Sequence, residues 1–187
     1  FVMIAVGFSS SAAMSSNTIV SVLGAFGTAV FFSAAAAWIF VKLPISFSAM
    51  LRGGMAREAG PTLWMGIPIF TLVGIGVLRV ASGAAHNLVG TSIPPIIWFG
   101  FIGLLLTAQL VMGLFGYAVM RSQNYFGHFV RGPGRSIASY GLICPGVALV
   151  TLAQFFIHWG LVENGIVVKY SAAHITLLAI VAALQLL

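Results

Sequence analysis

The sequence predicts an all-α, polytopic integral membrane protein built of helical hairpins, with a central pore between them as a further hypothesis. Of its 187 residues, 60% are hydrophobic and only 5% are charged, whereas a soluble domain carries about 25% charged residues. The mean hydropathy is +1.12, and the apolar residues stand in long blocks instead of short alternating segments. Long blocks favour transmembrane helices over the strands of an outer-membrane barrel.

Five blocks approach or exceed the roughly 20 apolar residues that cross a bilayer as a helix. We expect five complete or near-complete spans, at 17–43, 61–83, 93–120, 137–161 and 171–187. Asn17 suits the N-cap of the first span, and Lys42 and Pro44 are expected to close it. Pro61 suits the first helical position of the second span. Residues 1–14 are interpreted as the end of a cut helix, so we expect a single transmembrane domain that is part of a longer chain.

The basic residues predict which way the spans run. The net charge of +6 comes from short segments between the apolar blocks, which indicates topology and not a nucleic-acid partner. One group of cations falls on one side: Lys42, Arg52, Arg57, Arg121, Arg131 and Arg135. Only Arg79 and Lys169 fall near the other side. The positive-inside rule places the larger group in the cytoplasm and predicts a multi-pass protein of the bacterial inner membrane.

Two of the expected spans resemble each other. Pro68 and Pro145 each lie about seven residues after the start of a span, with an aromatic residue, Trp64 or Tyr140, shortly before. A proline inside a membrane helix kinks the axis and frees a carbonyl group, which suits a place where helices or a wet cavity meet. The offset of 77 residues indicates repeated hairpins around an axis, as in parallel-repeat transporters. The alternative is coincidence, since proline is common in membrane helices.

One face of the fourth span carries side chains of varied chemistry. They follow helical steps of four, three, four and three: Cys144, Ala148, Thr151, Phe155 and His158. Together with Pro145, and with Pro68 and Thr71 of the second span, this stripe is a candidate lining for a substrate pathway, because polar residues within a membrane usually face a cavity. The alternative is a packing face, with Thr151 bonding back to its own helix and Cys144 acting as a small buried hydrophobe.

Histidines gather near the ends of three spans, on the side away from most of the cations. His158 and His174 belong to neighbouring antiparallel spans at similar depth, so the two imidazoles could hold the iron of a haem b axially. With Glu163, or with His86, they could hold a divalent metal. The alternative is that these interfacial side chains are hydrogen-bonded and bind no cofactor.

The segment Tyr140–Gly146, YGLICPG, resembles the penultimate helix of the tellurite-resistance/dicarboxylate transporter family, which includes malate and sulfite permeases and slow anion channels. The resemblance implies ten helices in five hairpins around a central pore, commonly as trimers, with the five spans as family helices six to ten. Family members tend to place a pore-plugging phenylalanine where this chain has Cys144, so either Phe155 plugs the pore or the pore is gated differently. The segment also resembles the TsoY family of bacterial membrane proteins, in whose selenoprotein members selenocysteine could occupy this position.

These observations favour a channel or transporter for small anions over an enzyme, because the sequence contains no phosphate loop, nucleophile elbow or zinc-ligand motif. The expected partners are the lipid bilayer, a small anion and further copies of the chain. The resemblance implies sulfur, selenium or tellurium oxyanions or small carboxylates as the transported species. Two alternatives stay open: a redox subunit that binds haem through His158 and His174, and a membrane anchor of a larger complex.

Overall fold

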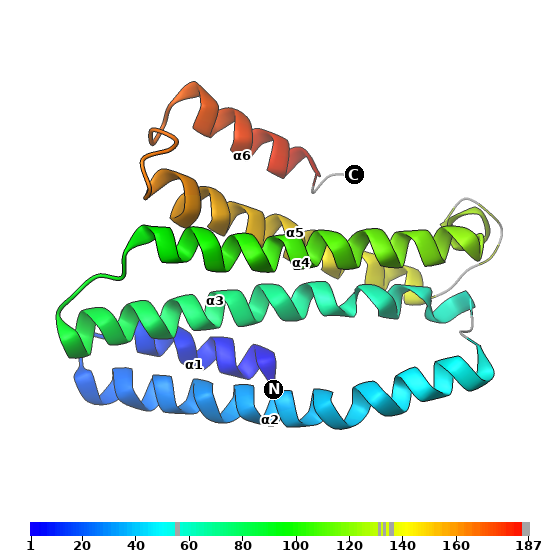
Figure 1. Ribbon diagram of the computed structural model, residues 1–187, viewed down its shortest axis with the longest axis horizontal. Coiled ribbons are helices and arrows are strands. Elements are labelled where there is room, and N and C mark those ends of the chain that lie inside the picture. The colour runs from blue at the N-terminus through cyan, green and yellow to red at the C-terminus, as the bar shows by residue number, and fades with distance from the viewer. Residues whose placement is uncertain (55–56, 131, 133, 135–136, 185–187) are drawn as a thin grey trace.

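The protein is a bundle of helices, shown as a computed structural model in Figure 1. The structure describes residues 1–54, 57–130, 132, 134 and 137–184, and helix accounts for 87% of it, with no strand in these ranges. The α-helices of the described part are α1 (Val2–Met14), α2 (Thr18–Gly53), α3 (Gly66–Ala84), α4 (Pro95–Ser122), α5 (Ile143–Phe155) and α6 (Ala172–Leu184). Two segments are 3-10 helices, η1 (Arg57–Met65) and η4 (Ile137–Leu142). Three are π-helices, η2 (Ala85–Val89), η3 (Phe126–Val130) and η5 (Phe156–Val162).

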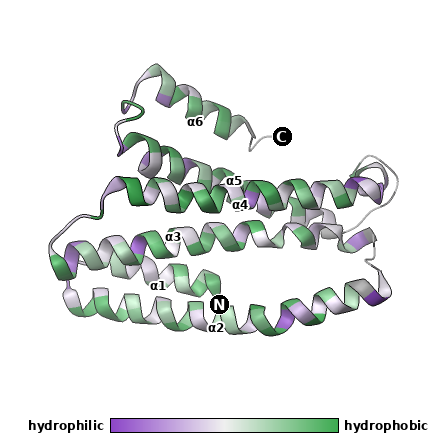
Figure 2. Ribbon diagram, in the orientation of Figure 1, coloured by the Kyte–Doolittle hydropathy of each residue, from purple (hydrophilic) through white to green (hydrophobic). Residues whose placement is uncertain are grey.

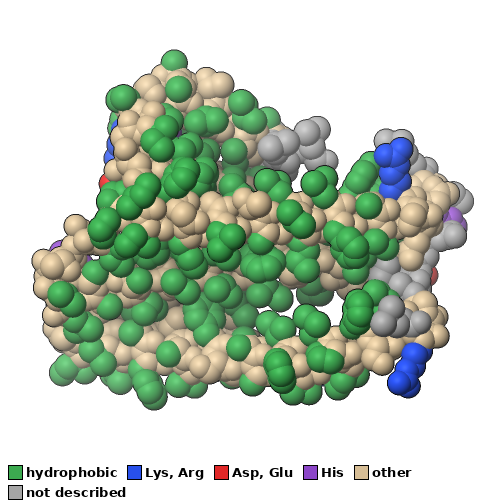
Figure 3. All heavy atoms as spheres, viewed as in Figure 1, with side chains coloured by type: hydrophobic (Ala, Val, Ile, Leu, Met, Phe, Trp, Pro, Cys, Tyr) green, Lys and Arg blue, Asp and Glu red, His purple; other side chains and the backbone are tan. Residues whose placement is uncertain are grey.

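Four helical stretches of the described residues are long and apolar enough to cross a membrane: Thr18–Met50, Glu58–Val89, Pro95–Ser122 and Ser139–Val162. Figure 2 shows hydrophobic residues along the whole length of these helices, and Figure 3 shows them covering the visible flank of the bundle. The predicted all-helical class is therefore confirmed, with four stretches long and apolar enough for a membrane protein. The expected fifth span, 171–187, corresponds among the described residues to the shorter helix α6, and the central pore stays a prediction.

Helix α2 runs further than the sequence predicts. Asn17 caps it as expected, because the side-chain Oδ1 accepts hydrogen bonds from two backbone N–H groups of the first turn, at 2.9 and 3.5 Å. The expected stop at Lys42 and Pro44 is wrong, since the helix continues to Gly53. Pro44 removes one N–H donor, but apolar residues continue on both sides. Within a membrane the remaining backbone bonds persist because no water competes for them.

Helix α1 is held between α2 and α3 by close backbone contact. A Cβ atom added at Gly24 of α2 would lie 2.6 Å from the backbone nitrogen of Ala12. One added at Gly83 of α3 would lie 2.9 Å from the carbonyl carbon of the same residue. Glycine therefore lets both helices approach α1 at one level, as small residues do in membrane bundles. The hydroxyl of Ser21 adds a hydrogen bond of 2.7 Å to the carbonyl oxygen of Ala12.

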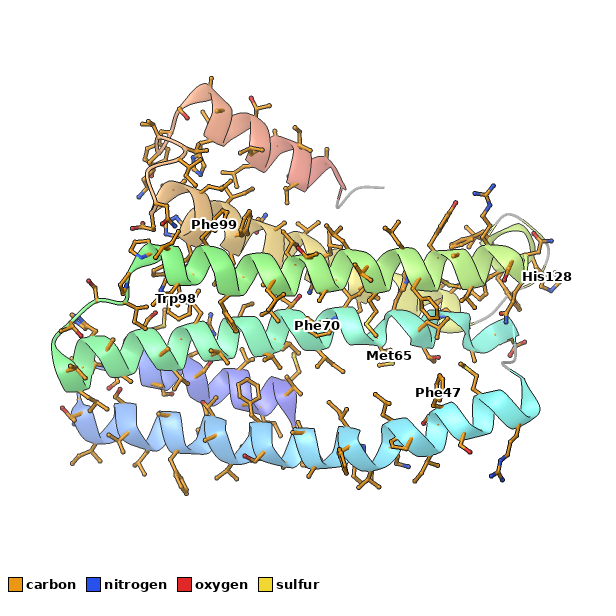
Figure 4. All side chains as sticks on the ribbon, in the orientation of Figure 1. Phe47, Met65, Phe70, Trp98, Phe99 and His128 are labelled. Carbon is orange, nitrogen blue, oxygen red and sulfur yellow. The ribbon has the colours of Figure 1, made fainter. Side chains whose placement is uncertain are left out.

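The apolar core lies where α3 meets the hairpin of α4 and α5. Its buried members are Leu78, Trp98, Ile102 and Leu152. Figure 4 shows Trp98 pointing from α4 toward α3, while Phe99 points to the other side of the helix. Phe99 packs there against Phe156 of η5, with ring centroids 5.4 Å apart. The core thus fixes α3 against both helices of the hairpin.

Basic residues mark one end of the bundle. Helices α2 and α4 end, and η1 begins, at the same end in Figure 1. Arg52 lies in the last turn of α2 and Arg121 in the last turn of α4, so we call this the basic end. Lys169 lies in the connection before α6, at the opposite end, and Lys42 lies within α2. The side chain of Arg57 and the residues Arg131 and Arg135 lie outside the described residues.

Replacing Gly83 by alanine is expected to destabilise the bundle, because the added methyl group collides with the backbone of Ala12. Overpacking of this kind lowers the free energy of unfolding by about 1–3 kcal/mol. Gly7→Ala in α1 is the matched control, because a Cβ atom there meets nothing within 4 Å. Reversible unfolding in mixed micelles measures both variants. Equal stabilities would show that α1 does not contact α3 as described.

Candidate functional site

The spans that contain Pro68 and Pro145 pass through the same order of helix types. In the first, η1 passes into α3 and then into the π segment η2; in the second, η4 passes into α5 and then into η5. Pro68 and Pro145 are each the third residue of their α-helix. Pro61 lies inside η1, and not at the first position of an α-helix as the sequence suggests. The backbone therefore repeats where the sequence repeats.

Proline accounts for the change of winding. It has no N–H group to donate to the carbonyl four residues earlier, which belongs to Trp64 for Pro68 and to Gly141 for Pro145. The 3-10 winding joins each carbonyl to an N–H group three residues on, so it tolerates the missing donor. Each span consequently changes from 3-10 to α winding next to its proline.

A cleft of about 240 Å³ lies between these two spans where the winding changes. Its walls are Pro61, Thr62, Met65 and Pro68 on one side and Gly141, Cys144 and Pro145 on the other. Figure 4 shows Met65 projecting toward the side on which α2 lies. The single cysteine of the chain is exposed, so Cys144 does not take the predicted role of a small buried hydrophobe.

One helical turn beyond the cleft, buried hydrogen bonds tie three helices together. The hydroxyl of Thr71 on α3 donates to the carbonyl oxygen of Ala148 on α5 at 2.8 Å. Gln109 of α4 donates from Nε2 to Thr71 Oγ1 at 2.6 Å, and to the carbonyl oxygen of Ile67 at 2.8 Å. Thr71 and Ala148 each follow a proline by three residues, so they occupy equivalent places in the two spans. We call these four residues the Gln109 junction.

Gln109 is the residue of the site that sequence reasoning missed. Its side chain is fully buried, and its Oε1 has no hydrogen-bond partner among the described residues. A buried acceptor without a partner lowers the free energy of unfolding by about 1–3 kcal/mol, so packing alone does not account for a glutamine here. The signal was a glutamine in the middle of the apolar stretch Pro95–Ser122, because polar groups inside a membrane are rare and usually functional.

The last three side chains of the predicted stripe, Thr151, Phe155 and His158, lie outside the cleft. Thr151 donates its hydroxyl to the carbonyl oxygen of Val147, on its own helix, at 2.8 Å. Phe155 packs against the apolar core. The π winding of η5 changes the helical register before His158, whose Nε2 lies 3.7 Å from Oε1 of Glu163. None of the three predicted pathway residues Thr151, Phe155 and His158 lines the cleft.

His158 and His174 each have a different neighbour, and His86 is exposed. No group of three or more His, Cys, Asp or Glu side chains in the described part of the chain could hold a metal ion. His174 is buried and accepts a hydrogen bond at Nδ1 from the backbone N–H of Tyr170 at 3.3 Å. His86 is exposed on η2. A haem b between His158 and His174 would require their Nε2 atoms to face each other, whereas Nε2 of His158 faces Glu163.

No family model, curated protein or solved structure matches the chain. The likeness of YGLICPG to the tellurite-resistance/dicarboxylate transporters therefore stays a prediction.

Removing the Thr71 hydroxyl is expected to weaken the junction. In Thr71→Val the side chain keeps its shape, but α3 loses its hydrogen bond to α5 and Gln109 loses one acceptor. Interhelical hydrogen bonds in membranes are worth about 0.6–2 kcal/mol, so the free energy of unfolding falls by about that amount. Thr107→Val is the control, since the Thr107 hydroxyl bonds only Gly103 of its own helix. The same loss in both variants would contradict the junction.

Proposed function

We propose that this protein is a channel or transporter for small anions whose pathway includes the cleft between the two proline-bearing spans. One observation carries the proposal: the cleft is lined by the corresponding prolines of two repeated spans, Pro68 and Pro145, and by the exposed thiol of Cys144. Interrupted helices at corresponding places of a repeat are a pointer to the substrate site of membrane transporters.

The charge of the chain supports an anion as the transported species. Eight Lys and Arg residues stand against two acidic residues. Arg52 and Arg121 lie at the basic end, toward which η1 and η4 extend from the cleft, and neither side chain lines the cleft itself. A positively charged end of the bundle raises the local concentration of anions of every kind. The positive-inside rule would place this end in the cytoplasm of a bacterium, with the protein crossing the inner membrane several times.

The lining of the cleft suits an anion that can make a polarisable contact. Its walls are largely apolar, and Cys144 adds a sulfur atom, which is soft and polarisable. Sulfur, selenium or tellurium oxyanions and small carboxylates are the proposed cargo. No carboxylate lines the cleft, since neither Glu58 nor Glu163 belongs to it, so the cleft itself holds no acidic group that would repel an anion.

The proposal extends to hairpins that surround a pore and to an oligomer, as in the trimers of the resembling family. Large apolar side chains are exposed along α2 and α4, including Phe26, Phe40, Leu104 and Leu114. Surfaces of this kind suit lipid tails or the packing of further copies of the chain within the bilayer.

Modification of Cys144 with a negatively charged methanethiosulfonate is expected to lower anion flux in liposomes about tenfold. The reason is that a fixed negative charge in a narrow pathway opposes anions by an energy of several kT. Flux is measured as anion-dependent dissipation of an imposed potassium diffusion potential. The chain has one cysteine, so the reagent acts at one site.

Cys144→Ala is the matched control for this experiment. It is expected to conduct anions and to be insensitive to the reagent. Gly146→Cys in the Cys144→Ala background moves the thiol two residues along, to a position where an added Cβ meets nothing within 4 Å, and is expected to be modified without effect. Wild-type liposomes without anion flux would refute the proposed function. Full flux after complete modification of Cys144 would remove the cleft from the pathway.

A further inference from the structure

An arginine lies inside the membrane-spanning stretch Glu58–Val89. The stretch has 32 residues, about 48 Å at a rise of about 1.5 Å per residue, whereas the hydrocarbon core of a bilayer is about 30 Å thick. If the stretch is centred on the bilayer, the hydrocarbon core spans about residues 64 to 83 and includes Arg79. From the positions of the basic residues in the sequence, Arg79 is expected near the membrane surface. A charged side chain at this depth is costly and marks a functional site by default.

No carboxylate of the chain neutralises Arg79. Of the two acidic residues, Glu58 lies at the far start of the same stretch and Glu163 is paired with His158. The Arg79 side chain is partly buried. A guanidinium has five N–H donors, and in the described part of the chain its only hydrogen bond runs from Nη1 to Ser10 Oγ of α1, at 2.6 Å. The other N–H donors of Arg79 have no partner in the described part of the chain.

The helices around the guanidinium are fixed by polar contacts. The hydroxyl of Ser10 donates to the backbone of its own helix at 3.2 Å, which leaves its oxygen free to accept from Arg79. Two turns further along, Asn87 Nδ2 donates to two backbone carbonyl oxygens, one in α1 and one in the turn after it, at 3.4 and 3.1 Å. It also donates to Ser21 Oγ of α2 at 3.1 Å. Arg79 is thus held on a fixed scaffold of three helices.

Arg79 shares a helical face with the cleft. Steps of four, three and four along α3 join Pro68, Leu72, Ile75 and Arg79. On one side of this face Thr71 contacts α5, and on the other Gly83 contacts α1. The face therefore looks between α5 and α1, with Pro68 at its cleft end and Arg79 about three turns further along.

We infer that Arg79, positioned by Ser10, binds the transported anion beyond the Gln109 junction and selects oxyanions over halides. The inference rests on the proposed function. A guanidinium presents parallel N–H groups that fit two oxygens of a carboxylate or similar oxyanion at once, whereas a spherical halide cannot use this geometry. Arg79 is thus a specificity-determining residue that the predicted pathway lacks.

The test compares formate and chloride permeability of the full chain in liposomes. Formate is an oxyanion with the same charge as chloride, so the ratio of the two permeabilities reports recognition of paired oxygens. Arg79→Lys keeps the charge and is expected to retain selectivity for anions over cations. The same variant is expected to lower the ratio of formate to chloride permeability about tenfold, which is the effect of losing one charge-assisted hydrogen bond. Arg79→Gln loses both selectivities, and Ser10→Ala lowers the ratio with the charge intact.

Arg121→Gln is the matched control, because Arg121 is exposed at the basic end and its loss is expected to leave the ratio unchanged. If the wild-type protein conducts anions and Arg79→Lys and Arg79→Gln keep its ratio, the role of Arg79 is overturned while the proposed function stands. If Arg79→Gln does not fold, unchanged ratios in Arg79→Lys and Ser10→Ala overturn it equally.

A second measurement separates the inference from transport itself. Formate, but not chloride, is expected to raise the melting temperature of the detergent-solubilised wild-type protein, and Arg79→Lys is expected to lose this effect. The same shift in Arg79→Lys would overturn the inference. Liposomes without anion flux would refute the proposed function and the part of the inference that concerns transport, whereas the melting-temperature shift would still report whether Arg79 binds formate.

Discussion

The bundle depends on a hydrogen-bond junction in the apolar interior of the protein. Inside a bilayer no water satisfies polar groups, so a buried glutamine and threonine must bond to each other or to the backbone. Gln109 and Thr71 do both, and the carbonyl of Ala148 completes a link through α3, α4 and α5. Because lipid tails are as apolar as leucine, such bonds and close glycine contacts determine which helices meet. The cleft lies where the two spans diverge again, one turn from the junction.

Local features of the sequence predict much of the fold. Hydropathy predicts the helical class, and Asn17 predicts the start of α2, because both act within a few residues of the chain. The end of α2 is not predictable in this way. Pro44 stops most soluble helices, but the surrounding apolar stretch keeps the helix intact as far as Gly53. The contact of Gly83 with Ala12 joins residues far apart in sequence, so only the fold reveals it.

The candidate site, like the fold, is predictable from the sequence only in part. Pro68, Pro145 and Cys144 are recognisable from sequence, and the structure gathers them into one cleft. The rest of the predicted stripe assumes an uninterrupted α-helix, which the π winding of η5 ends before His158. The charge of Arg79 is recognisable in the sequence, but its expected depth in the bilayer follows only from the bounds of the helical stretch. Along α3 the Gln109 junction lies between the cleft and Arg79.

Cross-linking can show whether η1–α3 and η4–α5 face each other across the cleft. Thr62 and Cys144 line opposite walls, so Thr62→Cys gives a cysteine pair that the shortest bifunctional methanethiosulfonate should join in membranes. Peptide mass spectrometry identifies the product, and Ser48→Cys, on α2, provides the comparison pair. If the two spans face each other as described, positions 62 and 144 form an intramolecular link rapidly, and positions 48 and 144 form little. Absence of the first link, with both thiols reactive toward a monofunctional reagent, would contradict it.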